Sequence, residues 1–371
     1  MLFINSFLIL GMNLIDRYIL KQFVNTLVFS IVALCIIFLV VNLIENLDDF
    51  IDNNAGFMEI AEYYIHFFPE ILKILTPVAT LLSTLFTIGR LSTQNEITAM
   101  KSGSMSLYRL MMPLVVFGFL LSLGQLYFNG WVVPKANEKK LELESIYLNK
   151  NEKGGPIFNL YLRDAPTRNI VMNYYNSEDK EGSKVAIEKF SDNYNPRLIS
   201  RIEADTIKWN ADSSGWVLKN GIVRNYSDKS VKIIFFDEKY PEINITHDQI
   251  IQLRKSTEEM TLDELHNYIK LLEKGGKDVR RQMIDYYSEY AFPYANLVVI
   301  LFGVPFASIR KRGGIAVQIG AAMVVSFTYM IFTEFSKTVG FSAGLTRWCA
   351  GWFVNIWFVI FAVINIFNTK T

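Results

Sequence analysis

Six stretches of the sequence contain no Asp, Glu, Lys or Arg, and they constrain the fold more than any other feature. They cover residues 22–44, 74–89, 110–134, 290–309, 313–333 and 348–369. Crossing the hydrocarbon core of a bilayer takes about 20 apolar residues, and five of the six stretches are that long. The second stretch, residues 74–89, reaches this length only if it is extended back past Glu70 and Lys73. The pattern predicts a polytopic α-helical membrane protein, because buried helices of a soluble protein would not leave six such blocks.

Charged residues are concentrated in one part of the chain. Between Lys135 and Arg281 lie 25 of the 37 Lys and Arg and 24 of the 36 Asp and Glu residues. Short segments rich in β-branched and aromatic residues recur there, separated by polar or glycine-containing turns; they cover residues 170–175, 201–209, 215–226 and 231–236. Strands this short at such spacing indicate a sandwich, jelly roll or open barrel. Thr261 and Glu264 then have the spacing of a capping box, which predicts an amphipathic return helix.

The expected organisation is three spans, an all-β domain and three further spans. Residues 12–134 would contain transmembrane helices 1–3, with a short polar helix at 92–103 between the second and the third. Residues 135–281 would form the β-domain with its return helix, and residues 282–371 helices 4–6. The first 11 residues are apolar but lack a basic start, so they do not indicate a signal peptide, and Met12 is an alternative start of the chain.

The basic residues between the spans predict the orientation in the membrane. With the N-terminus inside, nine bases face the inner side: Arg17, Lys21, Arg90, Lys101, Arg109, Arg310, Lys311, Arg312 and Lys370. The short outer loops then contain only Lys337 and Arg347. This positive-inside bias places both termini in the cytoplasm and the β-domain outside.

The segment "GRLSTQNEITAMKSG", residues 89–103, is too short and too polar to span a membrane. Thr93 and Glu96 have capping-box spacing, and Gly103 lies where such a helix would end. Ile97 and Met100 would share one face. One interpretation is a structural turn in which Glu96 only caps the helix. The other is a coupling helix that docks on a cytoplasmic partner and offers Glu96 to a basic group there.

Signatures of catalysis are missing from the sequence. It contains no G-x-x-x-x-G-K-[ST] phosphate loop and no G-x-S-x-G nucleophile elbow. His66, His247 and His266 are scattered, without Cys or carboxylate partners at metal-ligand spacing. A membrane-anchored enzyme acting on envelope lipids or glycans is therefore disfavoured. A scaffold or receptor that transports nothing is disfavoured by the short helix at 92–103, since a scaffold needs no docking element for a motor.

Three segments resemble one known family. The 89–103 segment is similar to the cytoplasmic loop of the lipopolysaccharide-export permeases, the LptF/LptG family. "DRYILKQF" at 16–23 resembles the opening of that family, and "VVPKANEK" at 132–139 resembles the exit from its third span. The layout of three spans, a β-domain and three spans matches the family over nearly the whole chain.

The resemblance implies a permease subunit of an ATP-driven exporter in the bacterial inner membrane. Two paralogous permeases would pair, and each would dock on one subunit of a cytoplasmic ABC ATPase dimer, which binds the ATP. The chain itself would be no enzyme and would hold no cofactor, metal or nucleic acid. Lipopolysaccharide would pass from among the membrane lipids to jelly-roll-like periplasmic β-domains that continue into a bridge protein with a similar β-domain. The alternative is an exporter permease for another envelope lipid or a lipoprotein.

Substrate contacts are less well indicated. Some family members carry lysines near the outer end of the first span, taken to meet substrate phosphates, whereas this chain has four acids there: Glu45, Asp48, Asp49 and Asp52. The bases near outer span ends are Lys73, Lys337 and Arg347, which could contact substrate or simply anchor at the membrane surface. Glu70 and Lys73 could also form an ion pair along one helix.

An apolar path for acyl chains is expected on the inner face of the β-domain, because a lipid that leaves the bilayer needs one. Ile202, Trp209 and Ile233 are predicted to point inward along this path. Lys208 and Lys232 are predicted to point outward.

Overall fold

A computed structural model describes residues 13–148, 157–177, 179–191, 196–210, 215–227, 230–252, 255–274, 278–308, 314–342 and 346–368. The basic residues Arg310, Lys311, Arg312 and Lys370 and the alternative start Met12 lie outside the described residues. The chain divides into two compact units. One contains Met1–Leu148 and Met283–Thr371, and the other contains Asn149–Gln282.

The first unit is helical. Its helices are α2 (Leu14–Asp52), α3 (Phe57–Thr93), α4 (Glu96–Ser102), α5 (Leu107–Tyr127), α6 (Val133–Tyr147), α9 (Arg280–Ala291), α10 (Ala295–Ser308), α11 (Gly314–Ser342) and α12 (Arg347–Asn368). A π-helical turn, η1 (Phe128–Val132), joins α5 to α6, and a 3₁₀ turn, η3 (Phe292–Tyr294), joins α9 to α10. Pro293 accounts for the second interruption, because it cannot donate a helical hydrogen bond.

Five stretches of the described chain are long and apolar enough to cross a membrane: Leu14–Asp52, Phe57–Thr93, Leu107–Tyr147, Arg280–Ser308 and Arg347–Phe367. The sixth predicted window, 313–333, falls largely in α11, a helix of 29 residues that is not among these five. At 1.5 Å per residue the 39 residues of α2 extend about 58 Å, well beyond a hydrocarbon core of about 30 Å. Its acidic end at Glu45–Asp52 can therefore lie in water.

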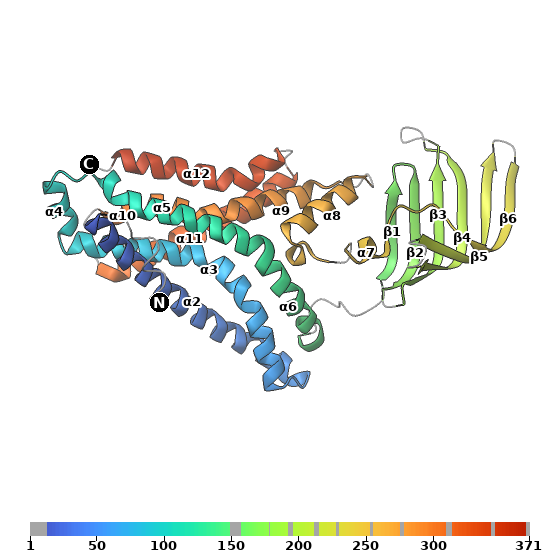
Figure 1. Ribbon diagram of the computed structural model, residues 1–371, viewed down its shortest axis with the longest axis horizontal. Helices are drawn as coiled ribbons and strands as arrows, with labels where there is room; N and C mark the ends of the chain where they lie inside the picture. Colours follow the sequence, from blue (N-terminus) through green and yellow to red (C-terminus); the bar gives the residue numbers. More distant parts are fainter. Residues whose placement is uncertain are drawn as a thin grey trace. The chain divides into compact units, whose positions relative to one another are not determined.

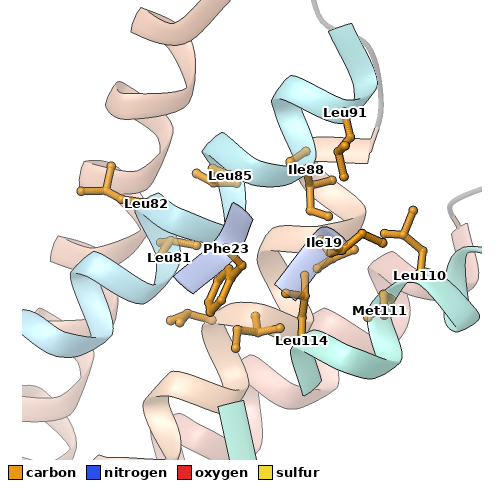
Figure 2. Close-up of a cluster of buried hydrophobic side chains, with 14 of the residues drawn as sticks. Ile19, Phe23, Leu81, Leu82, Leu85, Ile88, Leu91, Leu110, Met111 and Leu114 are labelled. Carbon is orange, nitrogen blue, oxygen red and sulfur yellow. The ribbon is translucent and has the colours of Figure 1, made fainter. Parts of the chain in front are cut away.

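Helices α2, α3 and α5 meet in a cluster of buried apolar side chains (Figure 2). Ile19 and Phe23 of α2 pack there against residues of α3 and α5 that include Leu81, Ile88 and Leu114. Val299, Ile300 and Val304 of α10 complete the cluster. These positions recur at helical spacing within otherwise apolar segments, so their burial in the bundle follows from the side-chain period of a helix.

The second unit contains one antiparallel sheet of six strands in sequential order (Figure 1). The strands are β1 (Ile157–Ala165), β2 (Arg168–Asn176), β3 (Glu181–Phe190), β4 (Leu198–Asn210), β5 (Gly215–Ser227) and β6 (Ser230–Lys239). The inserted β-domain is thus confirmed, but its strand order is that of a meander in one sheet, whereas a jelly roll has Greek-key crossings between two sheets. All four predicted strand segments lie within β2, β4, β5 and β6.

The alternation of side chains reverses along one row that crosses the sheet. On β4, Ala204 and Ile207 are both buried although they are three positions apart, an offset that places side chains of a regular strand on opposite faces. Lys184 on β3 and Asn220 on β5 flank Asp205 in the register and have φ angles of 52° and 51°. This left-handed conformation shifts the alternation of side chains by one position along the strand. The apolar residues on both sides of the row therefore reach the same core.

Residues after β6 cover part of the apolar face. Ile245 and Ile250, the latter in α7 (His247–Gln252), belong to the sheet's buried core. Trp216 Nε1 donates to the backbone oxygen of Ile245 at 2.6 Å, and the Tyr175 hydroxyl lies 2.5 Å from His247 Nδ1. Burial raises the pKa of Tyr175, so its hydroxyl stays protonated and donates to the imidazole.

Two sequence expectations about this unit are tested directly. The return helix is present as α8 (Leu262–Lys274), and its capping box is confirmed, because the Thr261 and Glu264 side chains each accept from the other residue's backbone N–H. The β-domain does not begin at Lys135, because residues up to Tyr147 continue the helical unit as α6. Pro134 at the start of α6 and the helix-favouring Lys, Glu and Leu that follow explain this difference.

Candidate functional site

The short helix expected at 92–103 is present as α4, but its start differs from the prediction. Thr93 belongs to the last turn of α3, and its hydroxyl donates back to the carbonyl of Gly89. The predicted capping box of Thr93 and Glu96 is therefore wrong. Asn95 occupies the N-cap position with φ 61°, a left-handed conformation that asparagine tolerates. The predicted stop is confirmed, since Gly103 is the C-cap of α4.

Ile97 and Met100 face the helical bundle. Ile97 is buried in the cluster of Figure 2, and Met100 packs against that cluster. Both side chains therefore anchor α4 to its own bundle, where a partner protein cannot reach Ile97. The exposed surface of α4 consists instead of polar or small residues such as Thr98 and Ala99.

Glu96 lies at the start of α4 and is partly exposed. Its Oε1 accepts a hydrogen bond from the Tyr18 hydroxyl at 3.2 Å, which links α4 to the first turn and a half of α2. Next to it, Arg109 at the start of α5 donates to the largely buried Asp16 carboxylate at 2.5 Å. Asp16 thus connects the beginning of α2 with that of α5, and Tyr18 orients the Glu96 carboxylate.

In the interior of α3, between Pro69 and Pro77, Glu70 and Lys73 each take part in an ion pair with a different helix. Lys73 Nζ lies 2.7 Å from both carboxylate oxygens of Glu289 on α9. Lys140 on α6 lies 2.8 Å from Glu70 of α3 and 3.4 Å from Glu144 of its own helix. The expected pair of Glu70 with Lys73 is therefore not formed. Each residue of that pair instead reaches across to a different helix.

The remaining two candidate bases lie elsewhere in the helical unit. Lys337 pairs with Glu334 one turn earlier on α11 at 2.9 Å. Arg347 is the first residue of α12 and is partly exposed. Lys73 and Lys337 are thus each paired with a carboxylate of the helical unit. Contact of Lys73, Lys337 and Arg347 with substrate stays a prediction.

The candidate path residues on the sheet divide between its two faces. Ile202 pairs with Val223, which pairs in turn with Ile234, so these three share the core face. Ile233 pairs with Arg224 and points to the opposite face, so its inward prediction is wrong. Both faces of β6 are apolar, which is why alternation could not separate Ile233 from Ile234.

Trp209 does lie on the core face. Its ring packs edge-on against Trp216, with 5.0 Å between ring centroids, at the end of the sheet that the segment after β6 covers. Ile202 lies beyond the row of reversed alternation and is partly buried. Ile234, on the other side of Val223 in the same row, is 43% exposed. The accessible apolar surface of the core face is therefore at Ile202 and Ile234.

Strand β6 forms one edge of the sheet and is the most exposed strand. Val231, Ile233 and Phe235 are all exposed, and Phe235 reaches 79%. An exposed apolar edge presents unpaired backbone groups to which another strand can add.

Among the described residues, no group of three or more His, Cys, Asp or Glu could hold a metal ion.

Comparison with known proteins places these features in a family. The family model described as the lipopolysaccharide export system permease LptF/LptG matches residues 17–367. The chain belongs to the LptF/LptG family. It is 22% identical over 331 residues to the lipopolysaccharide export system permease protein LptG of Escherichia coli, covering 86% of this chain and 88% of the relative. It is 21% identical over 341 residues to LptG of Haemophilus influenzae, with 87% and 89% covered.

Membership of the LptF/LptG family agrees with the segments quoted from the sequence. Sequence reasoning missed the contacts of Tyr18 with Glu96, Lys73 with Glu289 and Glu70 with Lys140. Their partners are 78, 216 and 70 residues apart in the chain, and no local pattern predicts such pairs. The one available signal was the presence of charges next to apolar spans, since these are paired or functional in most membrane proteins.

Proposed function

We propose that this chain is one permease subunit of an ATP-driven exporter that extracts lipopolysaccharide from the bacterial inner membrane. The observation that carries the proposal is the geometry of α4. Buried Ile97 fixes the helix to the bundle, while Glu96 stays partly exposed and is oriented by Tyr18. A carboxylate held in this way is suited to a basic group on a cytoplasmic ATPase dimer, which would supply the ATP hydrolysis.

The β-domain would receive the lipid. The surface at Ile202 and Ile234 offers apolar contact, and the exposed edge of β6 offers strand addition to a bridge protein with a similar β-domain. A second, paralogous permease would enclose the rest of the path. With both termini in the cytoplasm, α4 faces the ATPase and the β-domain lies in the periplasm, as the basic residues between the spans predict.

Isolation of the chain from membranes in a mild detergent tests the proposal. We expect an ATPase dimer and one paralogous permease to co-purify in fixed ratio. The complex, reconstituted in vesicles that contain lipopolysaccharide, should release it to a soluble β-domain acceptor only with ATP. Release of a lipoprotein or another envelope lipid in place of lipopolysaccharide would identify the alternative substrate. Release of lipopolysaccharide without ATP, or purification of the chain without an ATPase, would contradict the proposal.

A further inference from the structure

Helix α3 connects the coupling helix with both chain segments that flank the β-domain. At one end it continues through Gln94 and Asn95 into α4. In the part of α3 that precedes Pro77, Glu70 pairs with α6, the last helix before β1, and Lys73 pairs with α9, the helix that follows α8. Glu70 and Lys73 are three residues apart, so both pairs lie within one turn of α3.

The pair of α3 with α6 is largely removed from water. Lys140 and Glu144 are each 8% exposed. The Lys140 ammonium lies 4.6 Å from the centre of the Phe67 ring, and the Tyr63 hydroxyl donates to Glu144 at 3.1 Å. Charges in such surroundings are costly unless they are paired, so each removed partner leaves an uncompensated charge.

These pairs lie where α3 is weakest as a helix. Pro69 and Pro77 both lie inside it, and each removes one helical hydrogen bond. The carbonyl of Lys73 loses its donor at Pro77 and instead accepts from Gln125 Nε2 of α5 at 3.0 Å. A helix without such support bends at its prolines. Contacts with α5, α6 and α9 therefore converge on the segment that would otherwise flex.

We propose that α3 is the transmission element of the permease, and that Glu70 and Lys73 are positioning residues that carry the movement of α4 to α6 and α9. The inference rests on the proposed function and goes beyond it by assigning the mechanical path. A displacement of α4 by the ATPase reaches the segments on both sides of the β-domain together, because both are fixed to the same turn of α3. Lys73 and Lys140 act in this path through their carboxylate partners and are not phosphate ligands.

The test is the amount of lipopolysaccharide released per ATP hydrolysed by the reconstituted complex. Lys73→Gln and Glu70→Gln should lower this ratio by about fivefold or more while ATP hydrolysis continues, in the range of coupling energies typical of linked sites. The charge swap Lys73→Glu with Glu289→Lys should restore most of the ratio. Lys139→Gln is the matched control, because Lys139 is next to Lys140 but forms its ion pair along α6, with exposed Glu142. It should leave the ratio unchanged.

The outcomes separate the inference from the proposed function. If the unaltered complex releases no lipopolysaccharide with ATP, the proposed function fails and the inference fails with it. If the unaltered complex is active and Lys73→Gln keeps its ratio, only the inference is overturned. A variant that loses hydrolysis and release in proportion, without recovery in the swap, would show that the pairs serve folding alone and would also overturn it.

A crosslink between α3 and α9 provides a second measurement, in which the contact of residues 73 and 289 is fixed and not removed. Lys73→Cys and Glu289→Cys would be introduced together with Cys35→Ala and Cys349→Ala and joined by a short bifunctional thiol reagent. If residues 73 and 289 stay in contact while α3 moves, the crosslinked complex should keep its ratio of lipopolysaccharide release to ATP hydrolysis. Loss of release on crosslinking, with hydrolysis intact, would show that the helices must separate and would contradict the inference.

Discussion

Gln125 on α5 donates a hydrogen bond to the carbonyl of Lys73 on α3, and this is the carbonyl that Pro77 deprives of its helical donor. Gln125 in turn accepts from buried Asn296 on α10, whose own side-chain oxygen accepts from Thr80 at 3.2 Å. A proline inside a membrane helix is tolerated where neighbouring groups satisfy the freed carbonyl in this way. The proline and its partner therefore form one unit, although 48 residues separate them in the chain.

A double-mutant cycle should detect this unit. Gln125→Leu leaves the Lys73 carbonyl without a donor, at a cost of about 1–3 kcal/mol. Pro77→Ala restores the helical N–H to that carbonyl, so Gln125→Leu should cost less in the Pro77→Ala background. Thermal unfolding of the purified protein in detergent measures both differences. Equal costs in the two backgrounds would show that Gln125 does not compensate for Pro77.

Lipid capture should distinguish the two faces of the sheet. A photo-crosslinking residue at Ile202 or Ile234, on the accessible part of the core face, should capture lipopolysaccharide during ATP-driven release. The same residue at Ile233 should not, because its side chain points to the other face. These two neighbours on β6 are matched in size and chemistry. Capture at Ile233 alone would place the lipid path on the opposite face.

The edge of β6 should bind the bridge protein. Ile233→Lys places a charge on this edge, and charged side chains on edge strands oppose strand addition. It should reduce co-purification of the bridge protein and leave the ATPase bound. Ile199→Lys is the control, because Ile199 is similarly exposed but lies on the interior strand β4. An equal loss in both variants would point to general damage and against an edge contact.

The sequence was sufficient for the five spans named above, the β-domain and the polar helix before the third span. Absence of charge and the change of side-chain period are local properties of the sequence, so they can be recognised without knowledge of the fold. The reversal at Asp205 was not predictable, because it depends on left-handed residues of two neighbouring strands. Glu96 was predicted as a candidate because it lies between two spans, but its partner Tyr18 was not, because that contact exists only in the folded bundle.

Acid should loosen the segment that covers the sheet. Burial, assisted by nearby Lys180 and opposed by Asp248, lowers the pKa of His247. The unfolded chain, with a histidine pKa of about 6.5, then binds more protons than the folded one below that pH, so stability falls as the pH drops through this range. Protonation also removes the nitrogen lone pair that accepts from Tyr175.

Hydrogen exchange of the backbone amides at residues 243–252 tests this effect. Exchange should accelerate as the pH falls from about 7 to about 5, after correction for the intrinsic rate. His247→Gln should remove this acceleration, since the amide does not titrate, whereas His266→Gln should retain it. Acceleration that persists in His247→Gln would assign the effect to another group.

The docking role of Glu96 is tested most directly by exchange of charge with the ATPase. Loss of a buried partner from an interfacial ion pair costs about 2–5 kcal/mol, so Glu96→Gln should weaken ATPase binding by a factor of tens or more. Tyr18→Phe should weaken ATPase binding less, because it removes only the group that orients the carboxylate.

The decisive measurement is ATPase co-purification and ATP-dependent lipopolysaccharide release for Glu96→Lys, alone and with an acidic substitution at the contacting base of the ATPase. We expect loss in the single variant and recovery in the combination. Full binding and release by both Glu96→Gln and Glu96→Lys would show that α4 is a structural turn.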